Sequence, residues 1–163
     1  MAARHFFAVE IMNLISKLLS PENILLDVES TSKKRVFERV GLLFENSQKI
    51  GRSQVFDSLF AREKLGSTGL GQGVAIPHGR VKGLKDGVAA FVKTQNPIPF
   101  DAPDGQPVNL IFVLLVPERA TDLHLQLLAE LAQMFSNKTF REQLQNCNDP
   151  AEIHRLFSSW KAE

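Results

Sequence analysis

The run that most restricts the fold is VNLIFVLLV, Val108 to Val116, which is apolar almost without interruption. A strand with one face in water alternates apolar and polar side chains, whereas a strand covered on both faces does not need to alternate. The run therefore predicts a central strand with helices on both sides. Val88 to Val92 and NILLDV, Asn23 to Val28, are predicted as further strands of the same sheet.

Apolar side chains at helical spacing elsewhere in the chain supply the covering helices. They recur after the capping cluster Ser30-Thr31-Ser32 and again from about Ser53, where Gly66 is a natural C-terminal stop. In the C-terminal third, helices are predicted around Leu127 to Phe135, from Phe140 to Leu144 and from Asp149 onwards. The segment PIPFDAPDGQP is rich in turn formers and is predicted to be an exposed connection.

With 163 residues, 44% of them hydrophobic, the chain can bury one sizeable core but not two. We therefore expect an α/β fold, a single domain with a mixed β-sheet flanked by α-helices. MAARHFFAVE has no long apolar core, which makes it a poor signal peptide. Residues 1–11 are predicted to be a flexible N-terminal extension and residues 12–163 to be the domain.

Charge and cysteine content restrict the partners. The 19 Lys and Arg residues are scattered and nearly balanced by 18 Asp and Glu, so no basic patch predicts binding to nucleic acid or to an anionic membrane. We also expect no membrane insertion, because no membrane span is present. Cys147 is the single cysteine, which excludes an internal disulfide and a cysteine metal cluster and favours a cytoplasmic location.

The stretch LGSTGLGQGVAIPHGR, Leu65 to Arg80, is the candidate functional segment. Glycines leave backbone N–H groups uncovered, so Gly69, Gly71 and Gly73 are candidates to approach an anion such as phosphate. The stretch lacks the GKS or GKT of a P-loop, and its glycines have the wrong spacing for GxGxxG. Ser67 stands in GST, which excludes the GxSxG motif of serine hydrolases.

His78 is the residue of this stretch that can do chemistry. An imidazole with a pKa of about 6.5 is mostly neutral at pH 7, and its free nitrogen can attack phosphorus. Pro77 fixes the backbone before it, and Gly79 leaves space for a tetrahedral group or for a partner's surface. The alternative interpretation is a turn histidine that only hydrogen-bonds locally.

Two further residues are candidates for the same site. His124 falls in the first turn of a predicted helix, where an imidazole is kept neutral and can donate an N–H to a phosphoryl group. A core histidine satisfied by a carbonyl is the alternative. Arg62 and Glu63 each continue one apolar line of the preceding helix, so periodicity leaves open which of them points inward.

REKLGSTGLGQGVAIPHGR, from Arg62 to Arg80, resembles the phosphohistidine signature of the IIA proteins of the bacterial phosphoenolpyruvate-dependent phosphotransferase system, in its fructose/mannitol class. The segment FDAPDGQPVNLIFVLLVPERATDLHLQLLAELA most resembles the nitrogen-regulatory branch of these proteins. The resemblance extends from about Leu14 to Phe157.

The resemblance implies that His78 accepts a phosphoryl group from a phosphorylated HPr-like protein, with Arg62 and His124 lining the site. It also implies a mixed sheet between helices and phosphoryl transfer without a metal or a nucleotide cofactor. The phosphorylation state would then regulate target proteins such as a kinase or an ion transporter.

Three alternatives stand beside this reading. One is a sugar-transport component that passes phosphate from His78 to a IIB domain. Another is a regulatory binding module whose targets bind it equally well whether or not it is phosphorylated. A zinc centre is the third, and it would need a carboxylate such as Glu63 or Asp122 in addition to His78 and His124.

Overall fold

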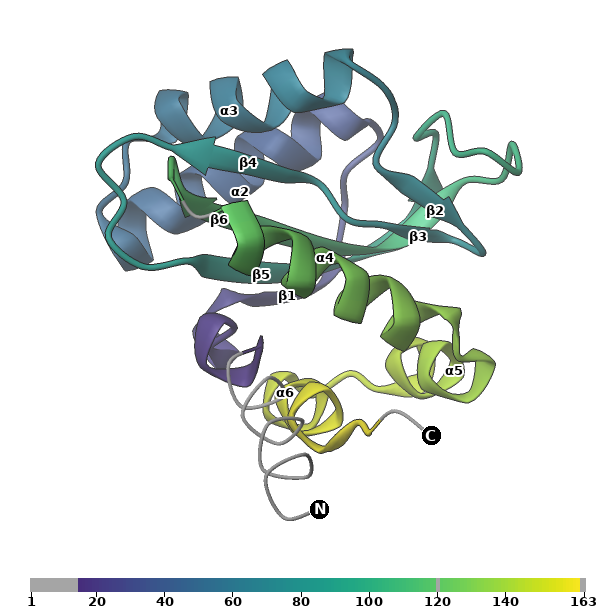
Figure 1. The fold of residues 1–163 in the computed structure, drawn as a ribbon. Helices are drawn as coiled ribbons and strands as arrows, with labels where there is room; N and C mark the ends of the chain where they lie inside the picture. Colours follow the sequence, from purple (N-terminus) through teal and green to yellow (C-terminus); the bar gives the residue numbers. More distant parts are fainter. Residues whose placement is uncertain (1–14, 120, 162–163) are drawn as a thin grey trace.

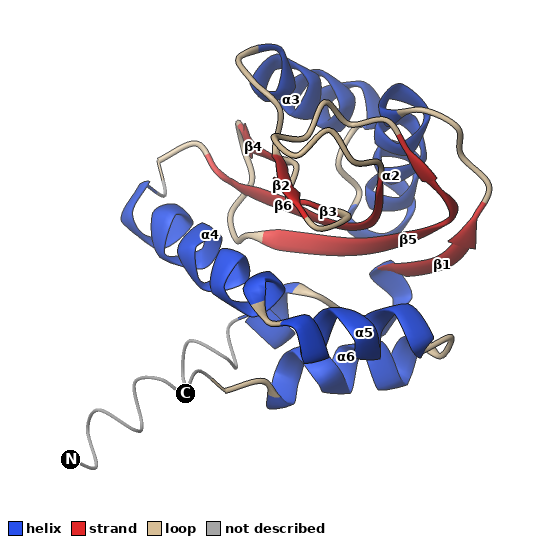
Figure 2. Cartoon of the chain, turned by 90° about the vertical axis from the view of Figure 1, so that its right-hand side faces the viewer, coloured by secondary structure: helices blue, strands red, loops and turns tan. Residues whose placement is uncertain are grey.

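A mixed sheet of six strands lies between two layers of helices, as the computed structural model shows for residues 15–119 and 121–161 (Figures 1 and 2). The strands are β1 (Ile24–Val28), β2 (Gly69–Gly71), β3 (Val74–Ala75), β4 (His78–Val81), β5 (Val88–Ile98) and β6 (Val108–Pro117). The helices are α2 (Lys33–Gln48), α3 (Arg52–Lys64), α4 (Thr121–Ser136), α5 (Lys138–Asn146) and α6 (Pro150–Ser159). A short 3₁₀ turn, η1 (Pro21–Asn23), precedes β1, and residues 15–18 are helical.

The predicted α/β class is confirmed, while the predicted extension, residues 1–11, lies outside the described residues. The strand order is β1-β5-β6-β3-β2, and β4 also pairs with β6. β5 and β6 are antiparallel, whereas β1 pairs with β5, and β3 and β4 pair with β6, in parallel. β3 and β4 thus follow one another along the same edge of β6.

β6 is covered on both faces, which confirms the prediction from its uninterrupted apolar sequence. Side chains at alternate positions enter two separate cores. On one face Leu110, Phe112, Leu114 and Val116 pack with side chains of α4, α5 and α6. On the other face Ile111, Val113 and Leu115 pack with side chains of α2 and α3. Burial of each such side chain contributes roughly 1.5–3 kcal/mol to stability.

Side chains at the helix starts follow the predicted capping pattern. Ser32 caps α2 by accepting a hydrogen bond from the backbone N–H of Arg35, and Asp149 caps α6 by accepting one from Ala151.

The connection from β5 to β6 was predicted to be exposed, but the structure shows that it is not wholly exposed. Phe100 is buried against the α2 and α3 layer, so a turn-rich composition did not reveal that this segment is anchored.

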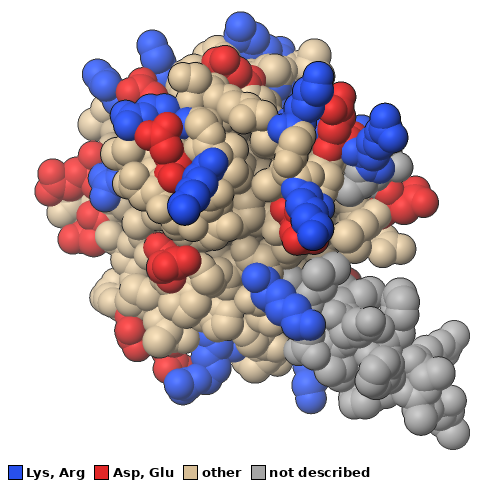
Figure 3. Space-filling view, turned by 90° about the vertical axis from the view of Figure 1, so that its left-hand side faces the viewer, with Lys and Arg blue, Asp and Glu red and all other residues tan. Residues whose placement is uncertain are grey.

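On the face of the molecule that Figure 3 shows, basic and acidic side chains are interspersed. That face therefore presents no extended region of positive or negative charge.

Within the part of the chain that the structure describes, no helix is both long enough and apolar enough to cross a membrane.

Lys93 joins the sheet to the C-terminal end of α5. From β5 its buried Nζ lies 3.1, 3.1 and 2.6 Å from the backbone carbonyl oxygens of Leu144, Gln145 and Cys147, and 3.2 Å from Oδ1 of Asn148, and these four acceptors share its three N–H donors. A cation is favourable at a helix C-terminus, where carbonyl groups have no partner within the helix. Lys93 therefore holds α5 against the sheet.

We expect Lys93→Met to lower the free energy of unfolding by about 2 kcal/mol, because the carbonyls at the end of α5, that of the buried Leu144 among them, lose their donor. The matched control is Lys34→Met on the exposed surface of α2, for which we expect a change within about 0.5 kcal/mol. Urea unfolding of both variants tests this. Equal stability of the two variants would contradict the role given to Lys93.

Candidate functional site

His78 is the first residue of β4. Ile76 and Pro77, which separate β4 from β3, form a break between two segments that both pair with β6. Val74 lies opposite Leu110 and His78 lies opposite Leu114, so the register is the same on both sides of the break. Pro77 has no N–H to donate, but its carbonyl still accepts a hydrogen bond from the N–H of Leu114 at 3.0 Å. The break therefore interrupts the strand without shifting its register.

The carbonyl of Ile76, at this break, fixes the ring of His78. Nδ1 of His78 lies 2.9 Å from that carbonyl oxygen. Because a carbonyl only accepts, Nδ1 carries the proton, and the lone pair of the neutral ring is on Nε2. Burial lowers the pKa of His78, and Arg62 lowers it further, while the Ile76 carbonyl and Glu63 oppose these effects. His78 is thus held as a neutral imidazole with a single available nucleophilic nitrogen.

Gly79 has a different role from the one that the sequence suggested. A Cβ atom at this position would lie 3.1 Å from the backbone C and O of Ser58 and would also collide with its Oγ. α3 therefore occupies the side of Gly79 on which a Cβ atom would lie, while Gly79 also lines the cavity that contains His78. Ser58 Oγ also donates to the carbonyl of Arg80 at 2.8 Å, which ties α3 to β4.

The direction of Arg62, which periodicity left open, is set by its neighbour Glu63. The Glu63 carboxylate is buried, and it accepts hydrogen bonds from Lys33 Nζ at 2.9 Å and from the N–H and Oγ1 of Thr68 at 3.0 and 2.6 Å. Glu63 is therefore the inward residue. Arg62 is turned to the rim, where its Nη1 donates to the carbonyl of Gly66 at 2.8 Å.

His124 is the fourth residue of α4, as predicted, and its side chain is almost fully buried at 6% exposure. Its ring lies edge-on to that of His78, with 5.2 Å between the centroids. Among the described residues, neither ring nitrogen has a hydrogen-bond partner, which is uncommon for a buried polar group. Within this part of the chain no carbonyl satisfies the ring, which argues against the core interpretation.

Burial lowers the pKa of His124 to about 4, and the neighbouring His78 and Arg80 add to this effect. At neutral pH the ring is uncharged, so it carries one N–H donor and one acceptor. An uncharged donor without a protein partner, beside His78, can serve an anion that reaches the site.

One open cavity of about 470 Å³ brings the three candidate side chains together. Its lining residues are Ser58, Ala61, Arg62, Leu65, His78, Gly79, Arg80 and His124. An adjoining cavity of about 170 Å³ shares Arg62 and His78 with the first. Arg80 is the lining residue that the sequence analysis missed. Its position two residues after His78 was the available signal, because alternate residues of a strand share a face.

The structure does not gather the three candidate glycines around His78. Gly69 lines the adjoining cavity, but its N–H donates to Ser67 Oγ at 3.0 Å. Gly71 and Gly73 have φ values of +90° and +78° and build the hairpin between β2 and β3. A phosphoryl-binding role for these N–H groups stays a prediction, and Gly69 is the best placed of the three.

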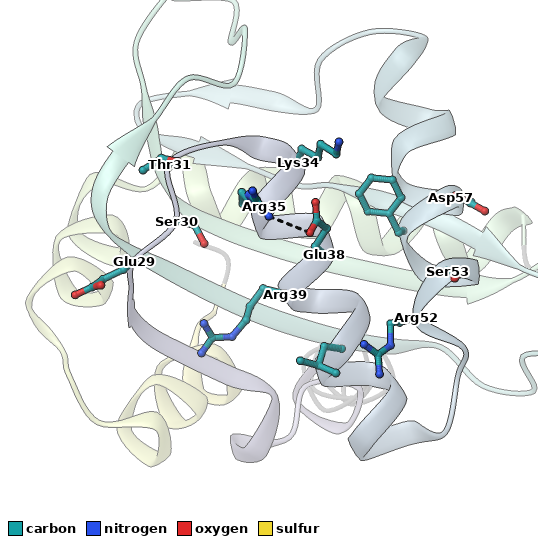
Figure 4. A pocket seen from close by; sticks show the side chains of 12 residues that line it. Glu29, Ser30, Thr31, Lys34, Arg35, Glu38, Arg39, Arg52, Ser53 and Asp57 are labelled. Carbon is teal, nitrogen blue, oxygen red and sulfur yellow. Dashed lines mark hydrogen bonds and ion pairs between the residues drawn. The ribbon is translucent and has the colours of Figure 1, made fainter.

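A larger groove, of about 700 Å³, lies elsewhere, between α2 and α3 (Figure 4). Glu38 and Arg35 of α2 form an ion pair within it at 3.5 Å, and Ser53 and Asp57 line it from α3. The groove contains no histidine, so we place the candidate site at His78 despite the smaller volume there.

Within the described residues, no three His, Cys, Asp or Glu side chains cluster as metal ligands.

The fold and the paired histidines define an α/β protein with a histidine-centred site, and comparison with known proteins gives its family. Residues 17–160 match the family described as "Phosphoenolpyruvate-dependent sugar phosphotransferase system, EIIA 2". The chain belongs to this family, which confirms the resemblance found in the sequence.

Several relatives share most of this chain. A nitrogen regulatory protein of Pseudomonas aeruginosa is 40% identical over 143 residues, which cover 87% of this chain and 93% of the relative. The crystal structure of nitrogen regulatory protein IIA-Ntr from Neisseria meningitidis has 53% sequence identity and a TM-score of 0.85, covering 88% of this chain and 99% of that one. The fructose-specific EIIABC component of Bacillus subtilis is 30% identical over 80% of this chain and 21% of that protein.

The pKa of His124 makes stability depend on pH. The unfolded chain has the ordinary value of about 6.5 and the folded protein a value of about 4, so the unfolded chain binds more protons between these values. The stability that His124 contributes is therefore fully present above pH 6.5 and is lost as the pH falls toward 4, by up to about 3 kcal/mol.

When the pH falls from 7 to 4, we expect the free energy of unfolding to decrease less in His124→Leu than in the wild type. The difference between the two decreases should be about 3 kcal/mol. The comparison measures the contribution of His124 together with its interaction with His78, because the two imidazoles affect each other's titration. Urea unfolding at the two pH values measures the difference. Equal losses in the two proteins would contradict a depressed pKa at His124.

Proposed function

We propose that His78 accepts a phosphoryl group on Nε2 from a phosphorylated HPr-like protein and that the chain acts as the phosphohistidine carrier of a nitrogen-regulatory phosphotransferase system. The observation that carries the proposal is the geometry of the His78 ring. Nδ1 is engaged by the Ile76 carbonyl, which leaves Nε2 available in a cavity that Arg62 and His124 also line. Membership of the phosphotransferase EIIA 2 family gives this geometry its chemistry.

In the proposed step, the lone pair of His78 Nε2 forms the new N–P bond while the N–P bond of the donor's phosphohistidine breaks. The donor's ring nitrogen keeps the electron pair of the broken bond. The proton on Nδ1 of His78 stays in place, and the Ile76 carbonyl stabilises the positive charge that the phosphorylated ring acquires. Phosphoryl transfer of this kind depends mainly on alignment and charge stabilisation.

Arg62 and His124 have different roles in this step. The guanidinium of Arg62 is a permanently charged fork that suits phosphoryl oxygens. His124 is neutral and adds an N–H donor without adding charge. A carrier must release its phosphoryl group again, and each 1.4 kcal/mol of excess stabilisation slows release about tenfold, so a neutral donor suits this task.

Exposed leucines around the cavity support docking of a protein donor. Leu65 is 85% exposed and lines the cavity, and Leu70 is exposed beside the adjoining one. Leu123 and Leu125 are exposed on either side of His124 in the sequence of α4. An apolar surface that surrounds a nucleophile favours contact with a protein rather than with a small polar substrate. Val74 and Ile76, apolar residues close to His78 in the sequence, are buried in the core and do not belong to this surface.

The nitrogen-regulatory assignment rests on the similarity to nitrogen regulatory proteins along most of the chain. We propose that the domain comprises residues 12–163 and that it acts in the cytosol. Its phosphorylation state controls partner proteins, and kinases and ion transporters are the classes to test.

The similarity to a fructose-specific EIIABC component favours a second candidate function, transfer of the phosphoryl group from His78 to a IIB domain. A purified IIB acceptor that became labelled at a rate comparable to that of the donor step would support this candidate.

The proposal predicts an acid-labile phosphoryl group on His78. Incubation with phosphoenolpyruvate, enzyme I and an HPr-like donor should label the wild type but not His78→Ala. We expect Arg62→Ala and His124→Ala to slow labelling by about 10- to 100-fold, because each removes a donor to the transferring group. The matched control is His154→Ala, since Nε2 of His154 donates to the carbonyl of Ser16, away from the cavity.

Circular dichroism of each variant separates slow transfer from loss of fold. Label that persisted in His78→Ala would place the acceptor elsewhere. Wild-type rates in either Arg62→Ala or His124→Ala would contradict the role proposed for that residue.

The docking surface gives a separate prediction. We expect Leu65→Asp to raise the KM for the phosphorylated donor about tenfold at unchanged kcat, because the charge lies at the interface and not at phosphorus. Leu42→Asp is the matched control, since Leu42 is also exposed but lies in the groove between α2 and α3. Steady-state transfer kinetics measure both. A similar KM for the two variants would exclude Leu65 from the interface.

A further inference from the structure

Arg80 lies on the same strand face as His78. Along β4, His78 and Arg80 are outside the core, whereas Gly79 and Val81 between and after them are buried. Arg80 lines the cavity that also contains His78 and His124. Arg62 lines the same cavity from α3, so two guanidinium groups reach it from two different elements.

Neither of these guanidinium groups forms an ion pair with a carboxylate of the described residues. Elsewhere Arg35, Arg52 and Arg155 each pair with a glutamate. Arg62 and Arg80 instead each donate from Nη1 to a backbone carbonyl, that of Gly66 at 2.8 Å and that of Glu118 at 3.2 Å. A guanidinium has five N–H donors, so these contacts orient the groups and leave most of their donors available to a bound anion.

Arg80 also acts on the second imidazole of the site. It is one of the charges that lower the pKa of His124, after burial and His78. The nitrogens of the buried His124 ring have no partner among the described residues. A cation beside this ring favours its neutral form, which is the form that adds a donor without adding charge.

We propose that Arg80 is a second guanidinium of the phosphoryl site, which donates hydrogen bonds to the transferring group. The inference rests on the proposed acceptance of phosphate by His78. Arg80 gains and loses no bond in the step: the phosphoryl group still passes from the donor's nitrogen to His78 Nε2, and Arg80 keeps all its protons. With Arg62, it supplies two positive charges to a group that carries two negative ones near neutral pH.

The test uses the full chain with Arg80→Gln, the conservative variant Arg80→Lys and the matched control Arg119→Gln. Arg119 is an exposed arginine in the turn after β6. One readout is the single-turnover rate of phosphoryl transfer from a phosphorylated HPr-like donor at saturating concentration, together with the KM for that donor. The second readout needs no phosphate: it is the titration of the His124 ring, followed by NMR in each unphosphorylated variant.

For Arg80→Gln we expect transfer to slow about tenfold or more with little change in KM, and the pKa of His124 to rise above its wild-type value. Arg80→Lys should recover part of the rate and most of the effect on His124, because lysine keeps the charge but loses the fork. Arg119→Gln should behave as the wild type in both readouts.

Wild-type transfer in Arg80→Gln, or a change in KM alone, would overturn contact between Arg80 and the phosphoryl group. An unchanged titration of His124 would overturn the placement of the Arg80 charge beside that ring. Failure of the wild type itself to accept phosphate on His78 would instead overturn the proposed function, and the role of Arg80 with it.

Discussion

The pairing of residues 74–81 with β6, and its single break at Ile76 and Pro77, is the constraint on which the site depends. The register is the same before and after the break, so β6 fixes where His78 lies. The N–H of Ile76 donates to the carbonyl of Thr68, and the carbonyl of Ile76 lies 2.9 Å from Nδ1 of His78. The register and this carbonyl together determine the position of the ring, its tautomer and the nitrogen left to react.

Around this fixed ring the fold gathers cations without counter-charges. The Glu63 carboxylate is fully engaged by Lys33 and Thr68, so it orients α3 without neutralising Arg62. Arg80 reaches the cavity from β4, and His124 enters it from α4 as an uncharged ring. Such a cavity is prepared for an anion, because its positive groups are already oriented and its imidazoles add no competing charge.

Much of this could be predicted from the sequence. The continuous apolar run of β6 predicted the three-layer architecture, because a strand covered on both faces does not need to alternate apolar and polar side chains. His78, Arg62 and His124 were identified by residue type, helical position and resemblance to a family, and the structure brings them to one cavity. Local patterns found His78 and His124 because each lies at the start of a regular element.

The remaining features depend on contacts between segments far apart in the chain. Gly79 looked like space for a ligand, but it is the point where α3 touches β4, which no local pattern records. The choice between Arg62 and Glu63 depended on Lys33, thirty residues away in the sequence. The glycines looked like a phosphate loop, yet Gly71 and Gly73 are required by the φ values of a hairpin. Arg80 shares a face with His78 only because residues 78–81 form a strand, which the glycine-rich residues before them do not indicate.

The central claim is that the protein offers Nε2 of His78, and not Nδ1, as its nucleophile. Long-range ¹H–¹⁵N correlation spectra of protein labelled with ¹⁵N-histidine, recorded near pH 7.5 before and after phosphorylation, test it directly. The account predicts that Nδ1 is protonated in the free protein and that phosphorus becomes bonded to Nε2. A proton on Nε2 in the free protein, or phosphorus on Nδ1 after transfer, would contradict it.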